Sequence, residues 1–303
     1  MHFGDRLAAA VAARESQIVL GLDPDPQKLW PEAVAAATGD TPVARAASAV
    51  AAHCVAAIDA AGPACVAIKP QHACFERLGA DGQVALRRTV EHAQAAGLIV
   101  LSDAKRGDID VSAKAYAQAL LGATPTPFGD VEGLGADAIT ANPYLGADTL
   151  APLIAIARER GRGVIVLVRT SNPGAAELQD QRLETGETVW ERVAGIVALL
   201  GAESLGPDSG LADVGAVTGA TVPEHLVRLR ELMPHTPFLL PGVGAQGGRV
   251  EDLAPAFAPG RAAGLVTASR GIVNAYDQAG GTPAAAARAE AERLRALAWS
   301  LGG

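Results

Sequence analysis

Charged side chains gather in the segment LSDAKRGDID, whose residues include Asp103, Lys105, Arg106 and Asp108. Val100 and Leu101 come just before this charge, so it follows an apolar run typical of a buried strand. In an extended segment, residues i and i+2 face the same side. We therefore expect Asp103 and Lys105 to point into one pocket, with Lys69 from the segment CVAIKPQ beside them.

An alternating array of carboxylate and ammonium groups can stabilise charge that develops during a reaction. Charges in a low-dielectric pocket are costly unless they are paired, and such arrays concentrate at functional sites. The alternative is a solvated cluster of salt bridges on a loop, but this does not explain why the charge ends a strand. Asp108 follows Gly107 in the next loop and is expected to point inward or toward a partner subunit. Arg106 is expected to be structural.

Three further segments carry polar groups after apolar runs. PGVGAQGG (241–248) has four glycines in eight residues, which lets backbone N–H groups approach an anion closely, and Arg270 can add a bidentate contact. VRTSNPGA (168–175) offers Thr170 and Ser171 to the polar edge of a ligand, although helix N-capping is an alternative for Ser171 or Asn172. LGLDPDP supplies Asp23 as an acceptor for ligand hydroxyls, with turn formation before proline as the alternative.

Other catalytic patterns are missing from the sequence. The six histidines share no motif, and the chain has no Ser-His-Asp order, HExxH, Walker loop or CxxC. Acids that are paired with lysines make poor metal cages, so no metal site is expected.

Short apolar runs repeat along the chain and predict eight strands covered on both faces. They occupy 17–23, 65–71, 98–105, 137–144, 163–172, 213–221, 237–244 and 263–271. Ala-rich stretches with helical spacing lie between many of them, at 42–61, 81–96, 146–160, 187–201 and 223–232. This alternation predicts a (β/α)₈ TIM barrel, and a doubly wound open sheet is the alternative.

Polar residues fall at or just after the carboxyl ends of these strands, which share one face in a parallel barrel and hold its active site. They are Asp23, Lys69, Asp103, Asn142, Arg169, Gln246 and Arg270. We expect one domain over residues 1–303 with two insertions. Residues 121–135 are interpreted as a loop, and 173–212 as a helix flanked by loops.

Composition excludes several classes of protein. The 303 residues are 49% hydrophobic, which is ample for a large core. Asp and Glu outnumber Lys and Arg by 33 to 25, so no general basic patch for nucleic acid is expected. The three cysteines lack metal-ligand spacing and are typical of buried residues in a reducing compartment such as the cytoplasm. Neither a signal peptide nor a membrane span is expected.

Taken together, the motifs resemble those of the orotidine 5′-phosphate decarboxylase family, in its longer bacterial (type 2) subgroup. The similarity rests on LGLD (20–23), IKPQ (68–71), DAKRGDI (103–109), VRTSNPGA (168–175), PGVGAQGG (241–248) and ASRGI (268–272). These blocks run in order from the first strand to the eighth, so the resemblance covers nearly the whole chain.

The resemblance implies a cofactor-free decarboxylation of orotidine 5′-phosphate to UMP and CO₂ in pyrimidine biosynthesis. Lys105 would stabilise the C6 carbanion and then protonate it, and Asp103 would lie beside the substrate carboxylate. Lys69 would hold Asp103 and contact the ribose. Asp108 would come from the other subunit of a homodimer with shared sites.

The resemblance also implies a set of substrate-binding residues. Asp23 would bind ribose hydroxyls, Ser171 the pyrimidine edge, and Gln246 and Arg270 the phosphate. Backbone amides from Gly244 through Gly247 to Gly248 would lie near the phosphate. Ile109 and Ser112 would line the neighbouring site, and the family more often has Thr at position 112. Two alternatives remain open, a Mg²⁺-dependent sugar-phosphate decarboxylase of the same fold and a non-catalytic nucleotide-phosphate-binding barrel.

Overall fold

The eight predicted strands close into one parallel barrel, which confirms the predicted fold class. The computed structural model describes residues 1–244 and 246–302. Around the barrel the order is β1, β2, β3, β6, β7, β8, β9 and β10, and β10 pairs with β1. The bounds are β1 (Ile18–Leu22), β2 (Ala67–Pro70), β3 (Ile99–Arg106), β6 (Ala138–Ala141), β7 (Gly163–Arg169), β8 (Val214–Thr218), β9 (Phe238–Leu240) and β10 (Gly264–Ala268).

Strand side chains alternate between the barrel interior and the surrounding helices. Val19, Leu101 and Leu265 lie in the interior cluster. Leu20 and Val266 lie in the outer cluster, between strands and helices. Both faces are covered, which is why the strands read as nearly continuous apolar runs in the sequence.

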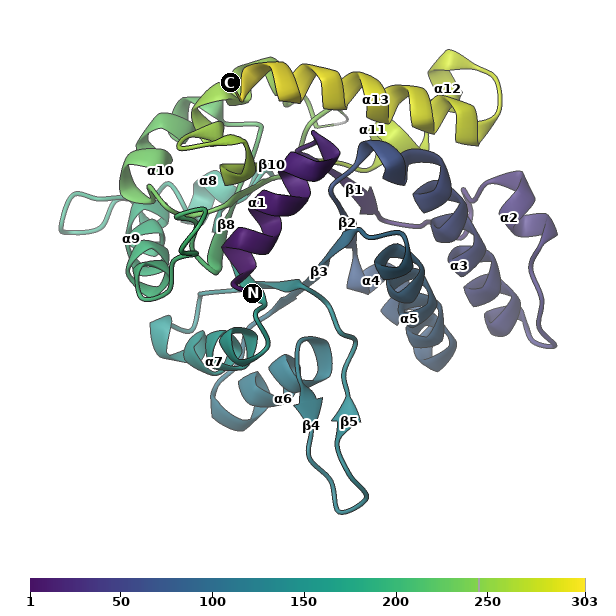
Figure 1. Cartoon of the computed structure of the whole chain (residues 1–303), viewed down its shortest axis with the longest axis horizontal. Coiled ribbons are helices and arrows are strands. Elements are labelled where there is room, and N and C mark those ends of the chain that lie inside the picture. The colour runs from purple at the N-terminus through teal and green to yellow at the C-terminus, as the bar shows by residue number, and fades with distance from the viewer. Residues whose placement is uncertain (245, 303) are drawn as a thin grey trace.

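Helices surround the barrel (Figure 1). The α-helices are α1 (Phe3–Arg14), α2 (Pro31–Ala35), α3 (Pro42–Ala61), α4 (His72–Glu76), α5 (Gly79–Ala95), α6 (Asp110–Leu120), α7 (Ala151–Glu159), α8 (Ala175–Leu178), α9 (Val189–Ala202), α10 (Leu226–Leu232), α11 (Arg270–Val273), α12 (Tyr276–Ala279) and α13 (Pro283–Leu301). Short 3₁₀ helices are η1 (Gly62–Ala64), η2 (Ala147–Thr149), η3 (Pro223–His225), η4 (Val250–Phe257) and η5 (Arg261–Ala263).

Several helices begin where the sequence provides a cap. The Thr41 side chain accepts a hydrogen bond from the Ala44 N–H at the start of α3. Thr188 and Glu191 form a reciprocal capping box at the start of α9. Each such cap contributes about 1 kcal/mol to helix stability.

Helix α1 closes the amino-terminal end of the barrel (Figure 1). Phe3 and Leu7 are buried against the interior cluster, and each contributes about 1.5–3 kcal/mol by burial. A Cβ at Gly163 would lie 2.7 Å from the Phe3 ring, so glycine makes room for that ring at the start of β7. Access to the interior is therefore left to the carboxyl end of the strands.

Both predicted insertions contain regular structure. Residues 121–135 are not a plain loop, because β4 (Ala123–Thr124) and β5 (Val131–Glu132) pair as an antiparallel hairpin that projects from the barrel (Figure 1). Residues 173–212 contain α8 and α9, together with the isolated bridges Arg182–Thr188 and Leu205–Ala212. Alternating patterns of two residues are too short to predict a hairpin of this size.

One helical segment, Pro42–Ala64, is long and apolar enough by length and composition to cross a membrane. Half of its most apolar window is buried inside the protein. Val50, Cys54 and Ile58 belong to the outer core cluster, and α3 packs against α5 and α13. Core helices meet the same criteria, and the packing of α3 is that of a core helix.

Candidate functional site

A cavity of about 480 Å³ lies at the carboxyl end of the strands. Predicted site residues from six strand ends line it, namely Asp23, Lys69, Asp103, Lys105, Ser171, Gln246 and Arg270. Residues far apart in the sequence thus meet in one hollow, as expected for a parallel barrel.

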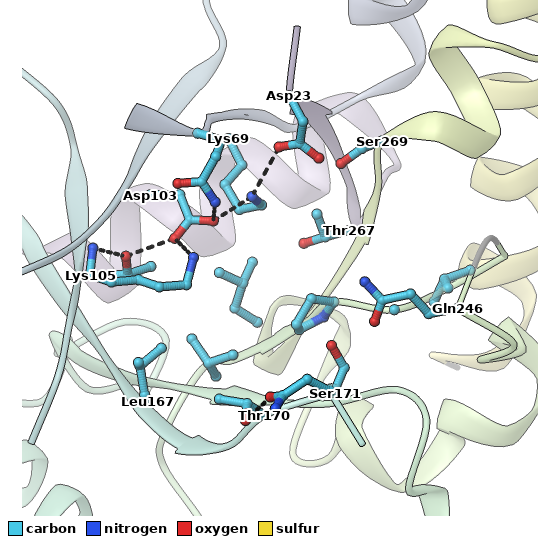
Figure 2. A pocket seen from close by; sticks show the side chains of 18 of the residues that line it. Asp23, Lys69, Asp103, Lys105, Leu167, Thr170, Ser171, Gln246, Thr267 and Ser269 are labelled. Atoms are coloured by element: carbon cyan, nitrogen blue, oxygen red, sulfur yellow. Dashed lines mark hydrogen bonds and ion pairs between the residues drawn. The ribbon is translucent and has the colours of Figure 1, made fainter. Parts of the chain in front are cut away.

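Asp103 lies at the centre of the charge array (Figure 2). Its Oδ2 accepts hydrogen bonds from Lys69 Nζ at 2.6 Å and Gln71 Nε2 at 3.1 Å. Its Oδ1 accepts from Lys105 Nζ at 2.6 Å and Thr140 Oγ1 at 2.9 Å. Lys69 Nζ also lies 3.9 Å from Asp23 Oδ1. Four donors therefore satisfy both oxygens of the buried carboxylate.

The two lysines differ in their exposure to solvent. The side chains of Lys69 and Asp103 are 7% and 6% exposed, whereas that of Lys105 is 44% exposed toward the mouth of the cavity. Burial alone would raise the pKa of Asp103, but the ammonium groups of Lys69 and Lys105 outweigh it and hold this pKa well below its ordinary range. Burial alone would lower the pKa of Lys69, but Asp103 and Asp23 outweigh it and raise this pKa. Asp103 and Lys69 are therefore both held in their charged forms.

A bulge in β3 aims Lys105. Ser102 pairs with Ile139 and Arg106 pairs with Ala141, so residues 103–105 lie opposite Thr140 alone. Lys105 adopts a left-handed backbone with φ 48°. For a residue other than glycine this conformation costs roughly 1–2 kcal/mol. Asp103 and Lys105 therefore line the same cavity as predicted, but because of this bulge and not because of simple strand alternation.

Inward-facing strand residues form the floor of the cavity, and sequence reasoning missed them. Leu167, Val217 and Leu239 are apolar, whereas Thr140 and Thr267 carry hydroxyls. Among the described residues the buried Thr267 hydroxyl has no hydrogen-bond partner, so a ligand group can bond to it (Figure 2). Counting back by two along each strand from its polar end could have found this layer.

The predicted phosphate end combines a glycine-rich turn with two long side chains. Gln246 and Arg270 line the cavity, and Arg270 begins α11. Gly244 and Gly247 adopt φ 75° and 92°, which favours glycine at both positions.

The glycine amides differ from the expectation. The Gly244 N–H donates to Gly248 O, the Gly247 N–H to Gly244 O, and the Gly248 N–H to Gly242 O. Gly244 lines an adjoining hollow with Arg270 and does not line the main cavity. These amides stabilise the turn itself, since a tight turn uses its own donors. The Ala245 amide, part of the same predicted set, lies outside the described residues.

Ser171 is held at the cavity by the backbone after β7. Its carbonyl accepts a hydrogen bond from Thr221 Oγ1 at 3.1 Å. Thr170 is bonded to Gln179, whose Nε2 donates to Thr170 Oγ1 at 2.9 Å. Helix α8 begins after Gly174 without a side-chain cap, so the capping alternative for Ser171 is wrong.

Three predicted residues lie outside the cavity of their own chain, namely Asp108, Ile109 and Ser112. Asp108 Oδ1 accepts a hydrogen bond from the Ile109 N–H at 2.8 Å. The residues Ile109 and Val111 are 60% and 80% exposed. The structure thus leaves this apolar end of the β3–α6 loop on the surface.

Other predicted polar residues support the barrel mouth without lining the cavity. Arg106 forms an ion pair with Glu76 and stacks over Tyr116, as expected for a structural residue. Arg169 makes a bidentate pair with Asp180 at 2.8 and 2.9 Å, which fixes the start of the second insertion. In residues 1–244 and 246–302 no group of three or more His, Cys, Asp or Glu side chains is arranged to hold a metal ion.

Comparison with known proteins identifies the family. Residues 16–288 match the model of the Orotidine 5′-phosphate decarboxylase / HUMPS family. The chain belongs to this family. A Rhodopirellula baltica protein named orotidine 5′-phosphate decarboxylase is 42% identical over 276 residues, covering 91% of this chain and 89% of that protein. Its namesake from Verminephrobacter eiseniae is 39% identical over 302 residues, covering 98% of each chain.

Solved structures agree with this family membership. The structure of Leishmania donovani OMP decarboxylase superposes with a TM-score of 0.73 at 32% sequence identity. The match covers 98% of this chain and 99% of that one. The similarity extends over the whole barrel, including the strand ends that carry the site.

Proposed function

We propose that the protein catalyses the decarboxylation of orotidine 5′-phosphate to UMP and CO₂, as a carboxy-lyase of de novo pyrimidine biosynthesis. Family membership supports the substrate and the reaction. The observation that carries the proposal is Asp103 between Lys69 and Lys105, in a cavity whose other end presents Gln246 and Arg270.

Lys105 is the proposed catalytic acid. Decarboxylation leaves a carbanion at C6 that the pyrimidine π-system cannot delocalise, so the protein must stabilise it with fixed charge. An ammonium group held beside C6 gains interaction energy only as this negative charge develops, which is differential binding of the transition state. Lys105 then protonates the carbanion and yields UMP.

Asp103 and Lys69 complete the array. Asp103 next to the substrate carboxylate adds a repulsion that is relieved as CO₂ leaves. Lys69 keeps Asp103 charged and lies near Asp23, which would bind the ribose hydroxyls. Several such effects must combine, because each tenfold gain in rate requires about 1.4 kcal/mol.

The remaining cavity residues are proposed to hold the substrate. Ser171 would bond the pyrimidine edge, and Gln246 and Arg270 the phosphate. Gln246 and Lys105 lie on opposite sides of the cavity, so in this arrangement the phosphate would lie across the cavity from the reacting carbon (Figure 2). Binding energy from the distant phosphate can then support the chemical step.

We also propose a homodimer with shared sites. Asp108 lies outside its own cavity, and the exposed Ile109 and Val111 beside it would be covered by a second copy. Asp108, Ile109 and Ser112 would then line the neighbouring site. Burial of two such side chains contributes about 1.5–3 kcal/mol each.

The cysteines support a cytoplasmic location for the protein. All three thiols are free, and burial raises the pKa of Cys54 and of Cys65 to about 12. Inert thiols of this kind are typical of proteins in reducing compartments.

An absorbance assay with orotidine 5′-phosphate in excess EDTA tests the proposed function. We expect the pyrimidine absorbance to change as UMP forms, at the same rate with and without the chelator. Loss of turnover in EDTA would point to a metal-dependent reaction of the same fold. Binding of the nucleotide without turnover would point to a non-catalytic barrel.

A further inference from the structure

We propose that Thr140 is a positioning residue that holds the β3 bulge and thereby aims Lys105. Thr140 lies on β6, lines the cavity floor and is 1% exposed. Its hydroxyl contacts both Asp103 and the backbone of Lys105. The inference rests on the proposed function, and Thr140 affects the reaction only by positioning Lys105.

Thr140 supplies a hydrogen-bond acceptor to the backbone of the β3 bulge. Residues 103–105 of β3 lie opposite Thr140 alone, so the ladder between β3 and β6 cannot pair every N–H of the bulge. The Lys105 N–H donates instead to Thr140 Oγ1 at 2.9 Å. This side chain therefore supplies the acceptor that the ladder would otherwise provide.

The Thr140 hydroxyl also donates a hydrogen bond to the Asp103 carboxylate. A threonine hydroxyl has one proton to donate and lone pairs to accept. Because the hydroxyl accepts from the Lys105 N–H, its own proton is available for Asp103 Oδ1, which it reaches at 2.9 Å. The hydroxyl thus accepts one hydrogen bond from the Lys105 backbone and donates one to Asp103, the carboxylate that also binds the Lys105 ammonium group.

These contacts close a ring through Lys105. The ring runs from the Lys105 N–H to the Thr140 hydroxyl, to Asp103 Oδ1, to Lys105 Nζ and back along the side chain. Lys105 is half-exposed and has a long flexible side chain, and its left-handed backbone is strained. Thr140 fixes the two ends of this side chain relative to each other, which preorganises the ammonium group.

Thr140→Val keeps the shape of the side chain but removes both hydrogen bonds. We expect kcat to fall about 10-fold or more, which corresponds to about 1.4 kcal/mol of transition-state stabilisation. KM should stay within about threefold of wild type, because Gln246 and Arg270 at the other end of the cavity are unchanged. Thr140→Ser keeps the hydroxyl and should restore kcat to within about threefold of wild type.

Thr89→Val is the matched control. Thr89 is fully buried in α5, and its hydroxyl donates to Ala85 O at 2.8 Å, away from the cavity. This variant also loses a buried hydroxyl bond, but its kcat should match wild type. A kcat for Thr140→Val equal to that of Thr89→Val, or no recovery in Thr140→Ser, would overturn the proposal.

Amide hydrogen exchange separates this inference from the proposed function. In wild type the Lys105 amide should exchange slowly, and in Thr140→Val at least about tenfold faster, because its hydrogen bond is lost. This result does not depend on the substrate, so it stands even if orotidine 5′-phosphate is not turned over. An unchanged exchange rate at Lys105 in Thr140→Val would contradict the proposed bond.

Discussion

Replacing the members of the charge array one at a time should destabilise the protein in an order set by burial. Asp103→Asn keeps the shape of the side chain but removes the charge that faces Lys69 and Lys105. Lys69 is then left almost fully buried, with Asp23 Oδ1 at 3.9 Å as its remaining carboxylate contact among the described residues. Breaking a buried pair in this way costs about 3–5 kcal/mol of unfolding free energy.

The two lysine variants should cost less. Lys69→Met leaves Asp103 with Lys105, Gln71 and Thr140 as donors, so the loss should be about 1–3 kcal/mol. Lys105→Met removes a side chain that is 44% exposed, and exposed ion pairs contribute at most about 1 kcal/mol. The expected order of destabilisation is therefore Asp103→Asn, then Lys69→Met, then Lys105→Met.

Equilibrium unfolding in guanidinium chloride at neutral pH measures these differences. The three tryptophans provide a fluorescence signal, and wild type and the three variants should unfold with equal slopes. Asp103→Asn should show the lowest midpoint. If Lys105→Met lost as much stability as Asp103→Asn, burial would not govern the energetics of the array.

Three further experiments test other parts of the site. The pKa of Asp103 is held below its ordinary value of 3.8, so the stability that the ionised carboxylate contributes is present above pH 3.8 and is lost as the pH falls below this value. The difference in stability between wild type and Asp103→Asn should therefore shrink between about pH 6 and about pH 3. A constant difference between their unfolding midpoints would contradict this. Arg270→Ala should lower kcat/KM about 10- to 100-fold for the phosphorylated substrate, because a hydrogen bond to a charged group contributes about 1.5–3 kcal/mol. The kcat/KM for unphosphorylated orotidine should not change. Equal losses of kcat/KM on both substrates would show that Arg270 does not bind the phosphate. If the protein forms the proposed homodimer with shared sites, mixing inactive Lys105→Ala and Asp108→Ala chains should restore about one quarter of wild-type activity, because half of the dimers would be hybrids with one intact site. No recovery after verified subunit exchange would rule out a shared site.

The sequence predicts the barrel and most of the cavity because both follow from strand periodicity. Runs covered on both faces mark the strands, and the polar residues that end them must meet at one face. This reasoning is sufficient to bring Lys69, Asp103 and Gln246 together.

Strand register and the choice between competing hydrogen-bond partners cannot be predicted from strand periodicity. The bulge in β3 depends on how β3 pairs with β6, a partner more than thirty residues away, and nothing in DAKRGD itself reveals it. The roles of Thr140 and Thr267 follow from that pairing and from strand alternation around the barrel. The glycine turn shows the same limit, because the bonds of the Gly244 and Gly247 amides within the turn depend on its folded geometry.

The turnover of orotidine 5′-phosphate by Lys105→Ala measures whether the Lys105 ammonium group carries the catalysis. We expect kcat to fall by at least about 10³-fold, because the group that stabilises the developing charge is removed. The variant should still bind UMP and unfold at nearly the wild-type midpoint, since Lys105 is half-exposed. Turnover by Lys105→Ala near the wild-type rate would contradict catalysis by this fixed charge.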